Sequence, residues 1–108
     1  MKEMDTVEEV KNYHVLVVGR RDYIIDNVRK ILAPKGFEVL AAMNDSDVFD
    51  TLKSKSIDVL FLGGSVEPNS KRDFADFIEE HSPSTKMIEH FGGPATILSE
   101  VQAALLQK

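Results

Sequence analysis

The chain has 108 residues, a formal net charge of −5 at pH 7, 43% apolar and 29% charged residues, and no cysteine. This length suffices for one domain with a hydrophobic core and is too short for two. The composition is that of a globular protein and argues against a disordered chain or a coiled coil. The absence of cysteine excludes disulfides, thiolate metal sites and thiol catalysis.

Charge and hydropathy argue against two classes of partner. The thirteen Lys and Arg residues are dispersed, so no basic face is predicted and general binding to nucleic acid is not expected. No apolar run approaches the length of a membrane span, and residues 1–12 are too polar for a signal peptide. We therefore expect a cytoplasmic protein that binds neither nucleic acid nor a membrane.

Four short apolar segments are predicted to be strands, the first of them buried on both faces and the third the most apolar stretch of the chain. They comprise residues 14–19, 37–42, 57–64 and 85–91. Residues 1–13 stand apart from this pattern as an N-terminal extension, either a short docked helix or a tail. The domain itself is expected to span residues 14–108.

A segment with helical periodicity follows each predicted strand. Asp22 is the expected N-cap of the first helix, which Gly36 ends, and Asn44 or Asp45 is expected to cap the second. The third helix is predicted over residues 71–81, and the last begins after Gly93 and Pro94. The apolar residues expected to face inward are Ile24, Val28, Ile31, Leu32, Val48, Phe49, Leu52, Phe74, Phe77, Ile78, Ile97, Leu98, Val101, Ala104 and Leu105.

Strict alternation of strand and helix predicts a parallel sheet with helices on both faces, a three-layer α/β domain. In such sheets ligands collect at the carboxyl ends of the strands, where the strand order reverses. The residues expected there, which we treat as candidate ligand-binding residues, are Gly19, Arg20, Arg21, Gly63, Gly64, Ser65 and His90.

Two interpretations of this corner stay open. Arginine side chains, glycine NH groups and a helix N-terminus could together bind a small anion such as a phosphate or nucleotide. Alternatively, the glycines only make tight turns, and the arginines lie in solvent beside Asp22 or Asp45. The histidines lack metal-ligand spacing, and no nucleophile, base and orienting group converge. No metal, no cofactor and no enzymatic activity are therefore expected.

Four stretches resemble the receiver domain of two-component response regulators, the CheY-like family, over most of residues 14–108. They are VLVV, KGFEVLAAMNDSDVFDTL, IDVLFLGGSVEP and EHFGGPATILSEVQAAL. The resemblance implies a flavodoxin-like fold with strand order 2-1-3-4, shortened by one β-α unit. It also implies that the fourth strand is an exposed edge, which a second copy of the chain or the N-terminal segment could cover.

The resemblance also implies which functional residues are lost. Gly19 and Arg20 stand where receivers carry the acidic pair that binds Mg²⁺, and Gly63 stands where they carry the aspartate that accepts a phosphoryl group. The lysine of the family falls near Glu89. A non-catalytic regulatory module that binds a protein partner, without phosphorylation, is therefore the first functional hypothesis. The alternative is a domain that binds a small anionic ligand at the corner with Arg20.

Overall fold

A computed structural model describes residues 13–90 and 93–106; residues 1–12 of the predicted extension lie outside the described part. The strands are β1 (His14–Val18), β2 (Glu38–Ala42), β3 (Val59–Leu62) and β4 (Lys86–Glu89). The helices are α2 (Asp22–Leu32), α3 (Asp45–Ser54), α4 (Pro68–His81) and α5 (Ile97–Leu106). Short 3₁₀ turns η2 (Ala33–Lys35) and η3 (Pro94–Thr96) follow α2 and precede α5. None of the helices in this part is long and apolar enough to cross a membrane.

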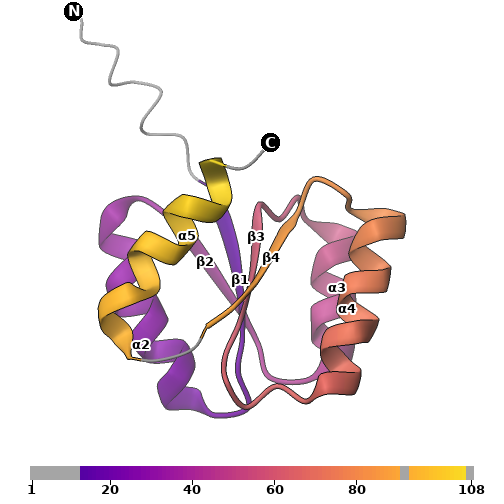
Figure 1. Ribbon diagram of the computed structural model, residues 1–108, viewed down its shortest axis with the longest axis horizontal. Coiled ribbons are helices and arrows are strands. Elements are labelled where there is room, and N and C mark those ends of the chain that lie inside the picture. The colour runs from indigo at the N-terminus through magenta and orange to yellow at the C-terminus, as the bar shows by residue number, and fades with distance from the viewer. Residues whose placement is uncertain (1–12, 91–92, 107–108) are drawn as a thin grey trace, which may run out of the picture.

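The four strands form one parallel sheet in the order β2-β1-β3-β4. Helices α2 and α5 cover one face and α3 and α4 cover the other, so the domain has three layers (Figure 1). The predicted fold class and strand order are therefore confirmed. Right-handed crossovers explain why α2 lies on one face and α3 and α4 on the other, because the chain reverses its direction across the sheet after β2.

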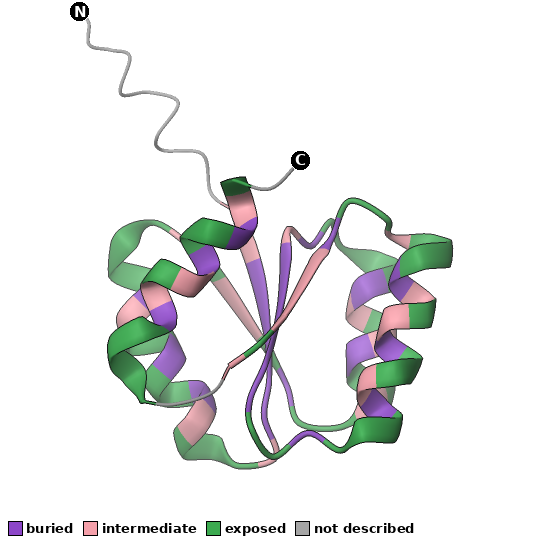
Figure 2. Cartoon of the chain, in the orientation of Figure 1, coloured by how far each residue is buried: buried purple, intermediate pink, exposed green. Residues whose placement is uncertain are grey.

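Two apolar clusters, one on each face of the sheet, form the core (Figure 2). Every residue of β3 is fully buried, as are all residues of β1 after His14. Their alternate side chains point to opposite faces and so supply both clusters. This is why both strands are continuously apolar in sequence, as central strands of a parallel sheet are.

The start of α2 differs from the prediction. Asp22 is the first residue of the helix and Arg21 is its N-cap, with no side-chain capping bond. The buried face of this helix contains Ile25 in place of Ile24, which is only half-buried. Asn44 caps α3 as expected, since its side chain accepts a hydrogen bond from the backbone NH of Asp47.

The third helix is longer than predicted, because α4 begins at Pro68 and not at residue 71. Proline suits the first turn of a helix, where its missing NH would have no partner in any case. The predicted inward residues Phe74 and Ile78 are buried, and Phe77 packs against the same cluster from a half-buried position. The extra turn brings Ser70 and the residue before the helix, Glu67, close to the carboxyl end of the sheet.

A buried hydroxyl fixes the start of the edge strand β4. Thr85 is 4% exposed, and its Oγ1 donates a 2.6 Å hydrogen bond to the carbonyl oxygen of Ile57, just before β3. Ser82 Oγ lies 2.6 Å from the same hydroxyl. The bond therefore ties the loop before β4 to the loop before β3.

Replacing Thr85 with valine keeps the shape of the side chain and removes its hydrogen bond. The carbonyl of Ile57 then stays buried without this donor, so we expect Thr85→Val to lower the free energy of unfolding by about 1–3 kcal/mol. Urea denaturation measures the change. Thr51→Val, at a half-buried helical position whose hydroxyl makes an exposed hydrogen bond, is the matched control and should change stability by less than about 0.5 kcal/mol. Equal stability of the two variants would contradict the role of Thr85.

Candidate functional site at the carboxyl end of the sheet

The structure brings the predicted site residues to one end of the sheet, directly after three neighbouring strands. Those residues are Gly19, Arg20 and Arg21 after β1, Gly63, Gly64 and Ser65 after β3, and His90 after β4. They do not form a single cluster. Arg21, Gly64 and Ser65 are exposed, whereas Gly19 and Gly63 are buried. Arg20 lies on the side of α3 and α4, and His90 contacts α5 on the opposite side.

The side chain of Ile24 explains why glycine occupies both buried positions, Gly19 and Gly63. A Cβ atom on Gly19 would lie 3.1 Å from Cγ2 of Ile24, and a Cβ atom on Gly63 would lie 3.2 Å from the same methyl group. The Cβ on Gly63 would also lie 3.3 Å from the carbonyl oxygen of Val18. These distances are shorter than ordinary carbon contacts. Ile24 therefore occupies the space that a side chain at either strand exit would need.

The guanidinium of Arg20 joins three loops of the sheet end. Nη1 donates to the carbonyl oxygen of Met43 at 2.8 Å, and Nη2 donates to Asp45 Oδ1 at 2.7 Å. Nε and Nη2 both donate to Glu67 Oε1, at 3.2 and 2.8 Å. Nη2 also lies 3.2 Å from Ser70 Oγ, whose hydroxyl donates to Asp45 Oδ2 at 2.6 Å. The loops after β1, β2 and β3 are thus held by one cation, and we call these five residues the Arg20 cluster.

Each ionisable group in the Arg20 cluster is held in its charged form. Burial of Arg20 opposes its charge, but hydrogen bonds and attraction from Asp45 and Glu67 outweigh burial and raise its pKa. The hydrogen bond from Ser70 is the main reason that the pKa of Asp45 is lowered, and Arg20 adds to the effect. The bond from Arg20 likewise lowers the pKa of Glu67. One arginine with two carboxylates leaves the cluster with a net charge of −1.

These contacts bear directly on the two interpretations of the corner. Arg20 lies beside Asp45, as the second interpretation predicts, although its side chain is only 21% exposed. Its donors already bind carboxylates, and the net negative charge of the cluster opposes a second anion. Anion binding stays a prediction that this geometry does not favour. The sequence does not predict Glu67 and Ser70 as partners of Arg20, since they lie 47 and 50 residues away along the chain.

His90 lies on the other side of the sheet end and is oriented by α5. Its Nδ1 is 2.7 Å from Glu100 Oε1, and its ring stacks on Phe61 with centroids 5.3 Å apart. Thr96 Oγ1 donates to the second carboxylate oxygen of Glu100 at 3.0 Å. No hydrogen bond between His90 and Ser65 occurs among the described residues, where no group of three metal-ligating side chains is found either.

Removing the Arg20 side chain should destabilise the domain. Arg20→Met leaves Asp45 Oδ1 and the Met43 carbonyl without the donor from Arg20, and we expect a loss of about 1–2 kcal/mol, reduced from the value for a buried pair because the carboxylates are partly exposed. Chemical denaturation measures the loss. Arg21→Met at the neighbouring exposed position is the control, with a change below about 0.5 kcal/mol expected. A loss of the same size in both variants would contradict the stabilising role of the Arg20 cluster.

The Arg20 cluster should also make stability depend on acidity. A carboxylate whose pKa is lowered on folding contributes stability that is present above its ordinary pKa and is lost as the pH falls through its lowered value. Wild type should therefore lose stability between about pH 5 and pH 3, whereas the advantage of wild type over Asp45→Asn should shrink over the same range. Denaturant titrations at a series of pH values test this, and a constant difference would contradict it.

Solved structures of similar fold have been found for this chain. A response regulator from Thermotoga maritima matches with a TM-score of 0.65 and 25% sequence identity, over 88% of this chain and 81% of that one. A response regulator receiver domain protein (CheY-like) from Methanospirillum hungatei JF-1 matches with a TM-score of 0.61 and 13% identity, over 88% and 94%. The receiver domain from hybrid histidine kinase CckA matches with a TM-score of 0.59 and 16% identity, over 85% and 98%.

The likeness lies in the three-dimensional structure. No family model matches the sequence, and no curated protein matches it. The sheet order and the helices on both faces agree with those of the CheY-like structures. This chain has the fold of the response regulator receiver domains and resembles them.

Proposed function

We propose that residues 14–108 form a receiver-like regulatory module that is non-catalytic and acts without phosphorylation. The receiver-like fold supports a regulatory role, because the similar structures are response regulators and a kinase receiver domain. The resemblance assigns the acceptor position to Gly63, which has no side chain to modify. Phosphoryl transfer to a receiver requires an aspartate there.

The packing of Ile24 against Gly63 is the observation that carries this proposal. The methyl group of Ile24 lies 3.2 Å from where a Cβ on Gly63 would be. An aspartate at this position would therefore displace a packed side chain and approach the backbone oxygen of Val18. The close approach of Ile24 leaves little room for a side chain at Gly63, which supports a corner that works without a carboxylate.

The position of Arg20 supports the same proposal. The resemblance places Gly19 and Arg20 where receivers have their acidic pair, and Mg²⁺ needs hard oxygen ligands. Here the carboxylates of Asp45 and Glu67 are bound to a guanidinium instead. A divalent cation would have to compete with a positive charge that is covalently attached to the chain, which disfavours its binding.

The outer edge of β4 is the surface that we propose for contact with a protein partner, which includes a second copy of the chain. Lys86 and His90 donate their backbone NH groups inward, to the carbonyls of Asp58 and Leu62. Because backbone groups alternate along a parallel strand, Met87 and Glu89 present theirs outward. Among the described residues no strand pairs with this edge, and an edge strand can accept a further strand.

Treatment with acetyl phosphate and Mg²⁺ tests the loss of phosphorylation. We expect no acyl phosphate on the wild-type chain by intact-protein mass spectrometry, and no spectral change with beryllofluoride and Mg²⁺. A receiver domain that retains its aspartate is the positive control. Acyl phosphate on wild type would contradict the proposal.

Gly63→Asp provides a sharper form of the same test. This variant should also stay unreactive, and overpacking against Ile24 should destabilise it by about 1–3 kcal/mol. Adding Ile24→Ala should recover part of that stability if steric conflict is the cause. Efficient phosphorylation of Gly63→Asp alone would show that Ile24 and Arg20 do not block the corner.

A further inference from the structure

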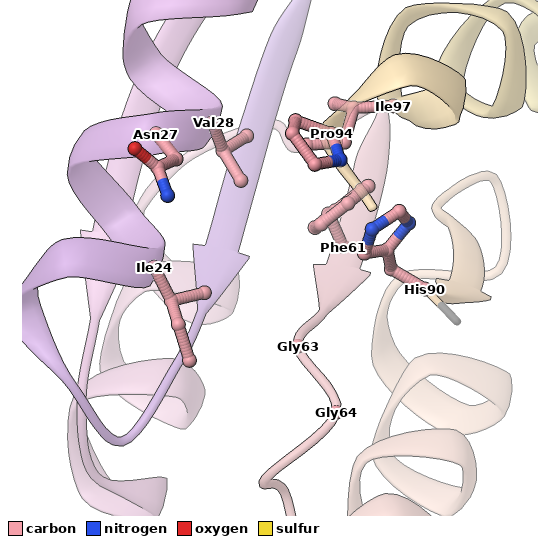
Figure 3. A pocket seen from close by; sticks show the side chains of 9 residues that line it. All are labelled: Ile24, Asn27, Val28, Phe61, Gly63, Gly64, His90, Pro94 and Ile97. Atoms are coloured by element: carbon pink, nitrogen blue, oxygen red, sulfur yellow. The ribbon is translucent and has the colours of Figure 1, made fainter. Parts of the chain in front are cut away.

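A pocket of about 310 Å³ opens at the carboxyl end of the sheet, on the side of α2 and α5. Figure 3 shows residues of α2 facing residues from the exits of β3 and β4 and from the start of α5. The described residues that line it are Ile24, Asn27, Val28, Phe61, Gly63, Gly64, His90, Pro94 and Ile97. The Arg20 cluster lies on the other side of the sheet and contributes nothing to this lining.

The position and size of this pocket suit a small molecule. It lies beside Gly63, at the exit of β3, where the strand order reverses between β1 and β3. Open parallel sheets bind ligands at such a switch point. Its volume is at the lower end of the range of about 300–1,000 Å³ for ligand sites. One or two rings would fill it.

The residues that line the pocket disfavour a charged ligand. None of the described lining residues carries a carboxylate, an ammonium or a guanidinium group. Val28, Phe61 and Ile97 lie almost fully buried beneath the pocket, and its accessible apolar surface comes from half-buried Ile24 and exposed Pro94. Transfer of a charged ligand to such a surface without a partner is strongly unfavourable. The pocket therefore differs from the predicted anion site, although both include Gly63, Gly64 and His90.

Two polar side chains and one aromatic stack set the shape of a suitable ligand. Asn27 is exposed at the rim, and its amide offers a donor and an acceptor side by side. His90 is held by Glu100 through Nδ1, which leaves Nε2 for a ligand. The rings of His90 and Phe61 are stacked with an interplanar angle of 29°, and flat ligands pack well beside such rings.

We propose that this pocket binds an uncharged planar heterocycle that has an amide-like hydrogen-bonding edge. The apolar rings of the ligand pack against Ile24 and Pro94, above the buried side chains of Phe61, Val28 and Ile97, and its polar edge meets Asn27 and His90. The proposal goes beyond the regulatory function above and does not depend on it, since binding here requires neither the presence nor the absence of phosphorylation. A bound ligand would contact both α2 and α5.

Nicotinamide and nicotinate form a matched pair of probes, because they share a ring and differ in an amide and a carboxylate. Titration of the ¹⁵N-labelled full chain, with adenine as a two-ring probe, follows the backbone amide signals. We expect saturable shifts for nicotinamide or adenine at Gly63, Gly64 and Ile97, and binding of nicotinate at least tenfold weaker. Absence of saturable shifts with both uncharged probes, or equal binding of nicotinate, would overturn the proposal.

A variant at the rim tests the assigned contact. Asn27→Asp removes the amide donor and places a negative charge at the pocket, so affinity for the uncharged probe should fall at least tenfold. Asp26→Asn, at the neighbouring exposed residue outside this pocket, should leave affinity unchanged. Thermal unfolding of both variants checks that they are folded, which is expected at exposed positions. Unchanged affinity in Asn27→Asp would refute the role of the pocket.

Discussion

The guanidinium of Arg20 holds together the three loops at the carboxyl end of the sheet. Its contacts reach the loop after β2 through Met43 and Asp45, and the approach to α4 through Glu67 and Ser70. A planar guanidinium suits this task, since its donors point in fixed directions toward several acceptors at once. Helices α3 and α4 are thereby positioned by a residue that lies just after the central strand β1.

The two sides of this end of the sheet differ in character. On one side the Arg20 cluster is charged and filled. On the other side the pocket beside α5 is uncharged and open. The pocket side is tight at Gly19 and Gly63, because a Cβ at these positions would lie 3.1 and 3.2 Å from Cγ2 of Ile24, which would have to shift. Glycine at the exits of β1 and β3 therefore has a packing role and not only the conformational role of a turn residue.

Much of the fold could be predicted from the sequence because its signals are local. Continuous apolar runs identify β1 and β3, and helical spacing identifies the helices between strands. The error of one residue on the inner face of α2 has a simple cause. Ile24 and Ile25 are adjacent, and a turn of 3.6 residues allows either to face inward until the packing of the helix is known.

The site could be predicted only in part. The sequence predicts that the residues after each strand meet at one edge, because parallel strands end there, but it does not predict that Arg20 and His90 lie on opposite sides of the sheet. The partners of Arg20 depend on which direction its side chain takes, and periodicity does not contain that information. Asp45 is one of two acidic residues that the sequence places beside the arginines. Glu67 is not predicted as a partner, because the sequence predicts the third helix from residue 71 whereas α4 begins at Pro68.

A covalently attached cation also changes how stability responds to the surroundings. A domain that binds a metal ion gains stability in proportion to the logarithm of the ion's concentration above its dissociation constant. The contacts of Arg20 with Asp45 and Glu67 are made within the chain and need no such ion. In place of that dependence the cluster has a dependence on pH, because its carboxylates must stay ionised. The geometry of this sheet end is therefore set within the chain. A ligand bound in the pocket between α2 and α5 would meet a corner that is already ordered.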